Sequence, residues 1–147
     1  MIEFKLDNKE ALRILQNVTK TLKDFKSPLN EVTKMQLKEI EHQYATEGRN
    51  ILGQGWKALK KATVQARLRS GYGASPILTA SGKMRRGHKK LKVTKSEAQV
   101  GNKDKNFVFH QLGTKNMAQR QIQGHSTPMI KKALDIVAEY IIKMAKK

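Results

Sequence analysis

The chain has 147 residues, with 30 Lys and Arg, 12 Asp and Glu, a formal net charge of +18 and no cysteine. A chain of this length usually forms one domain with its own core, and we expect a single domain over residues 1–147. The absence of cysteine excludes disulfides, thiolate metal sites and cysteine nucleophiles. The excess of positive charge predicts an anionic partner: nucleic acid, a membrane surface or an acidic protein face.

A membrane-spanning or secreted protein is not what the sequence predicts. No apolar run approaches the roughly 20 residues that a helix needs to cross a bilayer. The first ten residues also lack the basic, then apolar, then small-residue order of a signal peptide. We therefore expect a soluble protein that remains in the cytoplasm where it is made.

The first third of the chain predicts a strand and two helices. Apolar and charged residues alternate over Met1–Asp7, which is the period of a half-buried strand. Apolar residues then recur every three or four positions over Ala11–Phe25, the pattern of an amphipathic helix. Ser27 followed by Pro28 predicts the start of a second helix, which Gly48 ends. The two helices are expected to form a hairpin or a kinked pair.

The rest of the chain predicts a short helix, a small sheet and a final helix. The short helix is expected from Trp56 to about Arg69, followed by a loop over Ser70–Pro76. Thr127 and Pro128 repeat the start signal of a helix. Between the loop and this last helix, alternating apolar and polar residues predict an antiparallel meander of three strands: Gly87–Thr94, Ala98–Gly101 and Phe107–Gln111. The whole pattern predicts an α+β fold, with a small antiparallel sheet packed against the N-terminal helical hairpin and the C-terminal helix.

Positive charge is concentrated in the middle of the chain, where no acidic residue occurs between Glu47 and Glu97. In the first predicted strand, burial of Leu91 and Val93 would turn Lys90 and Lys92 toward solvent, so one face of the sheet is expected to be strongly basic. Such a face binds phosphates without reading base sequence, and its alternative interpretation is a solvated charged surface. The candidate contacts to DNA or an acidic partner are Lys83, Arg85, Arg86, Lys89, Lys90, Lys92 and Lys95.

The sequence contains few residue patterns typical of catalytic or metal-binding sites. The four histidines, at positions 42, 88, 110 and 125, do not have the spacing of a zinc site. A catalytic base needs an orienting acid, and the middle of the chain has none. We therefore expect no enzyme, metal or cofactor. Few aromatic residues and no recognition helix leave non-specific DNA binding as the alternative function.

Several short motifs occur in a fixed order between Trp56 and Gly124. Together they resemble the phage virion morphogenesis or tail-completion family of long-tailed bacteriophages, including the Mu-like phages. Two prolines of the family's pattern are replaced by Ala118 and Gln121, and Leu112 stands at an aromatic position. The matching residues are Trp56, Leu59 and Thr63; Leu78, Thr79, Gly82 and Arg85; His110, Gln111 and Gly113; and Arg120, Ile122 and Gly124.

The resemblance implies a structural virion protein, assembled in the host cytoplasm, that completes the tail or neck so that head and tail join. It implies a homo-oligomeric ring at the head-tail junction, in contact with neck, portal-side or tail proteins. The basic segment is then expected to face either the DNA channel or an acidic neighbouring ring. The motif residues interpreted as structural or interface residues are Trp56, Leu78, Gly82, His110, Gln111, Gly113, Arg120 and Gly124.

Overall fold

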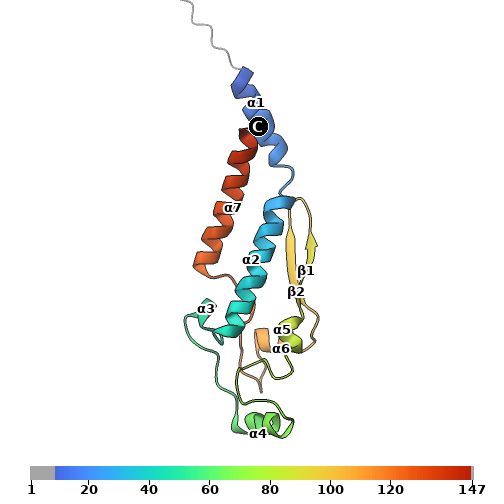
Figure 1. The fold of residues 1–147 in the computed structure, drawn as a ribbon, viewed down its shortest axis with the longest axis vertical. Coiled ribbons are helices and arrows are strands. Elements are labelled where there is room, and N and C mark those ends of the chain that lie inside the picture. The colour runs from blue at the N-terminus through green and yellow to red at the C-terminus, as the bar shows by residue number, and fades with distance from the viewer. Residues whose placement is uncertain (1–8, 147) are drawn as a thin grey trace, which may run out of the picture.

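The computed structural model describes residues 9–146, so the strand predicted over Met1–Asp7 lies outside the described residues (Figure 1). The elements in chain order are α1 (Lys9–Thr21), α2 (Lys26–Ala45), α3 (Arg49–Leu52), α4 (Lys61–Arg69), α5 (Lys83–Arg86), β1 (His88–Val93), β2 (Ala98–Asn102), α6 (Phe107–Leu112) and α7 (Thr127–Ala145).

Helix α2 is the central element of the fold (Figure 1). Helix α7 lies along one side of it and the β1–β2 hairpin along the other, while α1 extends beyond this body beside the C-terminal end of α7. The predicted α+β class is confirmed: an N-terminal helical hairpin, a small antiparallel sheet and a C-terminal helix are present. None of the helices in the described part of the chain is long and apolar enough to cross a membrane.

The boundary between the first two helices differs from the prediction. Helix α1 ends at Thr21, and Phe25 precedes α2 instead of closing α1. Phe25 is held at this turn because its backbone N–H donates to Lys95 O (2.8 Å) and its ring lies 6.3 Å from that of Tyr140 in α7. Contacts with two distant segments thus decide where the helix ends. No side chain caps the start of α2, although Ser27 predicted a hydroxyl cap.

The helix predicted from Trp56 begins later, at Lys61. The backbone N–H of Trp56 donates to Glu47 O (2.6 Å), which holds the chain against the end of α2. Gly48 lies beneath the indole with φ +98, and a Cβ added there would come within 2.4 Å of Trp56 Cδ1. Only glycine allows this close approach, because other residues rarely adopt this backbone angle. Helix α2 ends at Ala45, three residues before the predicted Gly48, and Glu47 is the first residue with a positive φ (+49); Gly48 follows and leaves room for the tryptophan.

Among residues 9–146 the sheet has two strands, whereas the predicted meander has three. β1 and β2 pair antiparallel from His88 opposite Asn102 to Val93 opposite Ala98. The segment predicted as the third strand is helix α6, which places Phe107 and Gln111 one turn apart on the inner face. The intervening Val108 is 52% exposed. A strand would need a pairing partner along its length, whereas a short helix satisfies its own backbone.

The core lies at the lower end of α2 in Figure 1. Its buried members come from α2, α5 and the loops around them: Ile40, Tyr44, Trp56, Met84 and Ile122. The partly buried side chains that pack against it include Leu78, Val100 and Phe107. Trp56, Leu78 and Ile122 belong to the predicted motifs, so the motifs contribute part of the core.

Candidate functional site

The segment of residues 120–124 crosses the end of α2 and is held by side chains rather than by a strand. Gln111 in α6 does most of this: its Oε1 accepts from the backbone N–H groups of Ile122 and Gln123, both at 2.9 Å. Its Nε2 donates to Gln123 O (2.8 Å). One amide side chain thus supplies the hydrogen bonds that a neighbouring strand would make.

Arg120 anchors the start of the same segment. The side chain is 7% exposed, and its guanidinium donates to Lys57 O (3.0 Å) and Ala58 O (3.2 Å). Its backbone N–H donates to His110 O (2.7 Å). Burial lowers the pKa of Arg120, yet the carbonyls that surround it are the acceptors a guanidinium needs. Arg120 therefore ties the chain before α4 to α6.

His110 makes its contact with Arg120 through the backbone, whereas its side chain is half-buried, and the buried Nδ1 has no hydrogen-bond partner in the described part of the chain. Burial, followed by the charge of Arg120, lowers the pKa of His110. Of the two neighbours interpreted as structural, His110 and Gln111, it is Gln111 whose side chain makes hydrogen bonds to the backbone of Ile122 and Gln123. Gly113 follows with φ +76, a positive backbone angle that glycine adopts readily.

The segment of residues 120–124, which we call the strap, is held from its other side by Trp56 and two glutamines of α2. Trp56 Nε1 donates to Gln121 O (2.9 Å), and Gln43 Nε2 donates to the same carbonyl (2.9 Å). Gln36 Nε2 donates to Gly124 O (3.0 Å). A Cβ at Gly124 would lie 2.7 Å from Gln121 Nε2, so a side chain there would disturb this packing.

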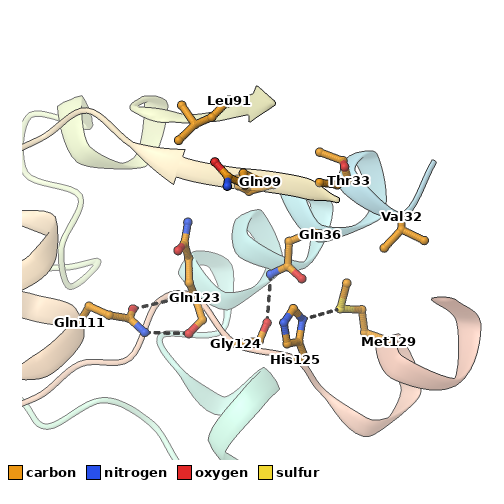
Figure 2. A pocket seen from close by; sticks show the side chains of 12 residues that line it. Val32, Thr33, Gln36, Leu91, Gln99, Gln111, Gln123, Gly124, His125 and Met129 are labelled. Carbon is orange, nitrogen blue, oxygen red and sulfur yellow. Dashed lines mark hydrogen bonds between the residues drawn. The ribbon is translucent and has the colours of Figure 1, made fainter. Parts of the chain in front are cut away.

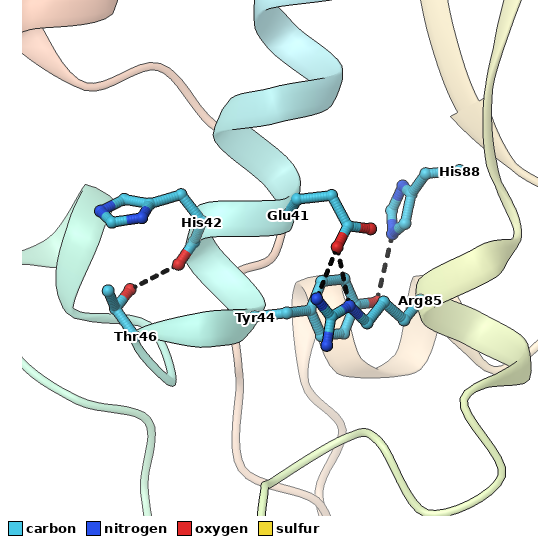
Figure 3. A network of polar contacts seen from close by, with 6 residues as sticks. All are labelled: Glu41, His42, Tyr44, Thr46, Arg85 and His88. Carbon is cyan, nitrogen blue, oxygen red and sulfur yellow. Dashed lines mark hydrogen bonds and ion pairs between the residues drawn. The ribbon is translucent and has the colours of Figure 1, made fainter.

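A polar network connects α2 to β1 (Figure 3). The Tyr44 hydroxyl lies 3.1 Å from His88 Nε2, and beside it Arg85 pairs with Glu41 at 2.7 Å. Burial lowers the pKa of His88 to about 4, partly offset by Glu41, and burial raises the pKa of Tyr44. His88 is therefore neutral at pH 7. Within residues 9–146 no group of His, Asp and Glu is placed to hold a metal ion.

A concave surface of about 540 Å³ lies where α5, β1 and the chain after β2 meet. None of its five cationic side chains has a carboxylate within ion-pair distance among the described residues. Asp104 is the acidic group in this surface, and its Oδ1 already accepts from Asn106 N (2.9 Å). We call this surface the basic cleft; its cations are Lys83, Arg86, Lys89, Lys103 and Lys105.

A bulge in β1 separates the predicted basic residues into different environments. The register shifts between Lys90 and Lys92, which leaves Leu91 as the extra residue. Leu91 is 56% exposed, contrary to the predicted burial, and its side chain lies over Gly101. Lys90 instead turns toward α2 and donates to Asn30 Oδ1 (2.7 Å), while Lys92 pairs with Glu97 (2.6 Å).

Only three of the seven predicted cations therefore line the basic cleft. Arg85 pairs with Glu41, and Lys95 lies in the turn of the hairpin, where its carbonyl accepts from Phe25. Lys103 and Lys105 were missed, because they follow the interval without acids in the sequence.

The model of the phage virion morphogenesis family matches residues 6–137, which is most of the chain. The chain belongs to this family. The resemblance seen in the short motifs is thereby confirmed. Membership of this family also supports a structural role in phage virion morphogenesis. No curated protein and no solved structure matches the chain.

In this virion morphogenesis protein, the motif residues form a packed and hydrogen-bonded end of the fold. Three buried positions were not predicted from the sequence: Gln43 and Ile122, which are fully buried, and Gln36, which is 8% exposed. A seven-residue separation of two glutamines on one helix face was the available signal. Polar residues at that spacing are usually solvent-exposed, so the signal was weak.

Proposed function

We propose that the protein is a structural component of the head-tail junction that forms a homo-oligomeric ring and completes the tail or neck. The observation that carries the proposal is the basic cleft on a chain of the virion morphogenesis family. A genome that passes a neck presents phosphates of every sequence, and unpaired cations attract phosphates without reading bases. A fixed concave surface of cations suits that contact.

The charge distribution along the chain supports the same arrangement. Residues 1–47 contain eight acidic and eight basic side chains, whereas residues 48–126 contain two acidic and 17 basic ones. Each subunit therefore has a nearly neutral N-terminal part and a strongly basic middle part. In a ring, subunits oriented alike would collect the basic parts on one circular surface, where mutual repulsion is offset by an anionic partner.

Deletion of the gene from its phage, followed by negative-stain electron microscopy of the lysate, tests the proposal. We expect DNA-filled heads beside detached tails of normal length, because the parts assemble but do not join. Supplying the wild-type protein from a plasmid should restore infectious particles. Intact, infectious particles in the deletion lysate would contradict the morphogenesis role and favour a non-specific DNA-binding protein.

A second arm of the experiment examines the basic cleft. A plasmid variant with Lys89→Gln, Lys103→Gln and Lys105→Gln should restore joining poorly, or restore joining without DNA delivery. The matched control neutralises three exposed lysines of α7, Lys131, Lys132 and Lys143, and so changes the net charge equally. If both variants restore infectivity fully, the cleft does not contact DNA or an acidic neighbour.

A further inference from the structure

A second cavity, of about 600 Å³, lies between β2, α2 and the segment that leads into α7 (Figure 2). Its lining is mixed. Val32 and Met129 contribute apolar surface, while Gln36, Gln99 and Gln123 contribute amide groups. It is separate from the basic cleft, which shares none of its lining residues. We call it the β2 groove.

One wall of the groove is an unpaired strand edge. β2 pairs with β1, and in the described part of the chain no other strand pairs with it. Every second residue along such an edge points its N–H and C=O groups away from the existing partner. Ala98 and Val100 of β2 line the groove, so this edge opens into it. A two-stranded sheet is marginal alone and gains stability when a third strand is added.

The opposite wall holds a buried acceptor. Gln36 is 8% exposed, and the hydrogen bond from its Nε2 to Gly124 O (3.0 Å) sets the orientation of its amide. Its Oε1 has no hydrogen-bond partner among the described residues. A buried acceptor left unpaired costs free energy, so this oxygen is suited to an incoming N–H donor. An extended backbone supplies such donors at regular spacing.

The chain itself contains a segment with the required pattern. Ile2, Phe4 and Leu6 alternate with Glu3, Lys5 and Asp7, so one face of an extended segment would be apolar and the other charged. These residues precede α1, whose N-terminal end lies at the tip of the molecule, beyond the end of α2 (Figure 1).

We propose that residues 2–7 of one copy bind in the β2 groove of a second copy as an added strand. The backbone of the segment pairs with the edge of β2, its apolar side chains enter the groove, and an N–H group reaches Gln36 Oε1. Donor segment and acceptor groove are different surfaces of the same chain. The contact is therefore heterologous, as a closed ring requires. This inference rests on the proposed ring and gives it an interface.

Disulfide trapping tests the exchange, because the natural chain has no cysteine. Full-length Phe4→Cys protein is mixed with full-length Val32→Cys protein and oxidised, and the products are separated on a non-reducing gel. We expect a dimer that contains one chain of each kind. Lys5→Cys should cross-link to Val32→Cys far less, because the adjacent side chain points to the other face of a strand. Phe4→Cys should not cross-link to Val108→Cys, an exposed position in α6.

Equal cross-linking of positions 4 and 5, or none, would overturn the proposal. So would a disulfide that forms only when both cysteines are on one chain, since the segment would then occupy its own groove. A synthetic peptide of residues 1–8 should suppress the mixed dimer. An unrelated extended peptide that competes equally well would contradict the choice of a second copy as the occupant.

A groove-filling variant provides an independent measurement. Val32→Trp should weaken self-association at least about tenfold in sedimentation, whereas Val108→Trp should leave it unchanged; thermal melting checks that both fold. Rings that form without the cross-link would overturn the strand exchange alone. A chain that stays monomeric at every concentration and salt tested would overturn both the exchange and the proposed ring.

Discussion

Single amide side chains act here as substitutes for secondary structure. Gln111 bonds the backbone of Ile122 and Gln123, and Gln43 accepts from Ile51 N (3.0 Å) while it donates to Gln121 O. Glutamine suits this role, because its amide presents a donor and an acceptor like a peptide group. The strap of residues 120–124 therefore remains attached to the core without belonging to the sheet.

Gln111→Leu tests this role. The leucine retains the approximate volume but leaves the N–H groups of Ile122 and Gln123 without their acceptor. We expect the free energy of unfolding to fall by about 1–3 kcal/mol, measured by urea denaturation. Gln65→Leu, at an exposed position in α4, should change it by less than about 0.5 kcal/mol. Equal effects of the two substitutions would show that the amide contacts contribute little.

At the scale of elements, aromatic rings connect the sheet to the helices. Tyr44 of α2 lies edge-on to Trp56 (ring centroids 5.8 Å apart) and to His88 of β1 (5.7 Å), and His88 lies edge-on to Phe107 of α6 (5.2 Å). Such pairs contribute beyond the area they bury. The neutral state of His88 is part of this packing, because a charged imidazole would need solvation that the site does not provide.

The packing of neutral His88 of β1 against Tyr44 of α2 should make the stability of the fold depend on pH. In the unfolded chain a histidine titrates near pH 6.5, whereas the pKa of His88 in the folded protein is about 4. As the pH falls from 6.5 to 4 the unfolded chain takes up a proton that folded His88 does not. Stability is therefore expected to fall across this window. The Tm of the wild type should drop more over this range than that of His88→Gln, and equal slopes would contradict the assignment.

At the scale of the whole molecule, the basic middle part and the nearly neutral N-terminal part occupy different regions. The basic cleft combines α5, β1 and the chain after β2, whereas the neutral part is α1 and α2 (Figure 1). Concentrated charge gives a strong local field, and contacts with phosphate release bound counterions. The affinity for an anionic polymer should thus depend on the cleft more than on net charge.

Binding of a random-sequence duplex at several salt concentrations measures this dependence. Neutralising Lys89, Lys103 and Lys105 should flatten the slope of log K against log salt by about 2 to 3 units, since each phosphate contact contributes about 0.9. The α7 control, with Lys131, Lys132 and Lys143 neutralised, should leave the slope nearly unchanged. Identical slopes for the two variants would mean that overall charge, not the cleft, governs binding.

Sequence patterns alone predict the family, the α+β class and the approximate positions of α1, α2, α4, α7, β1 and β2. These features depend on local patterns: apolar spacing, capping residues, glycines and short motifs. Gly48 and Gly113 were predictable for the same reason, since a turn with a positive backbone angle is a local requirement.

The tertiary structure decided what depends on partners far apart in the chain. Phe107–Leu112 is a helix whose Phe107 packs against the core and whose Gln111 binds the strap, and both partners lie far away in the chain. A one-residue bulge moved Leu91 and Lys90 to the opposite faces from those predicted. Lys103 and Lys105 lie in the basic cleft because β2 runs antiparallel to β1 and brings the chain after it back to the start of β1. Alternation and charge runs cannot specify such pairings, because register and long-range contacts are set by the whole fold.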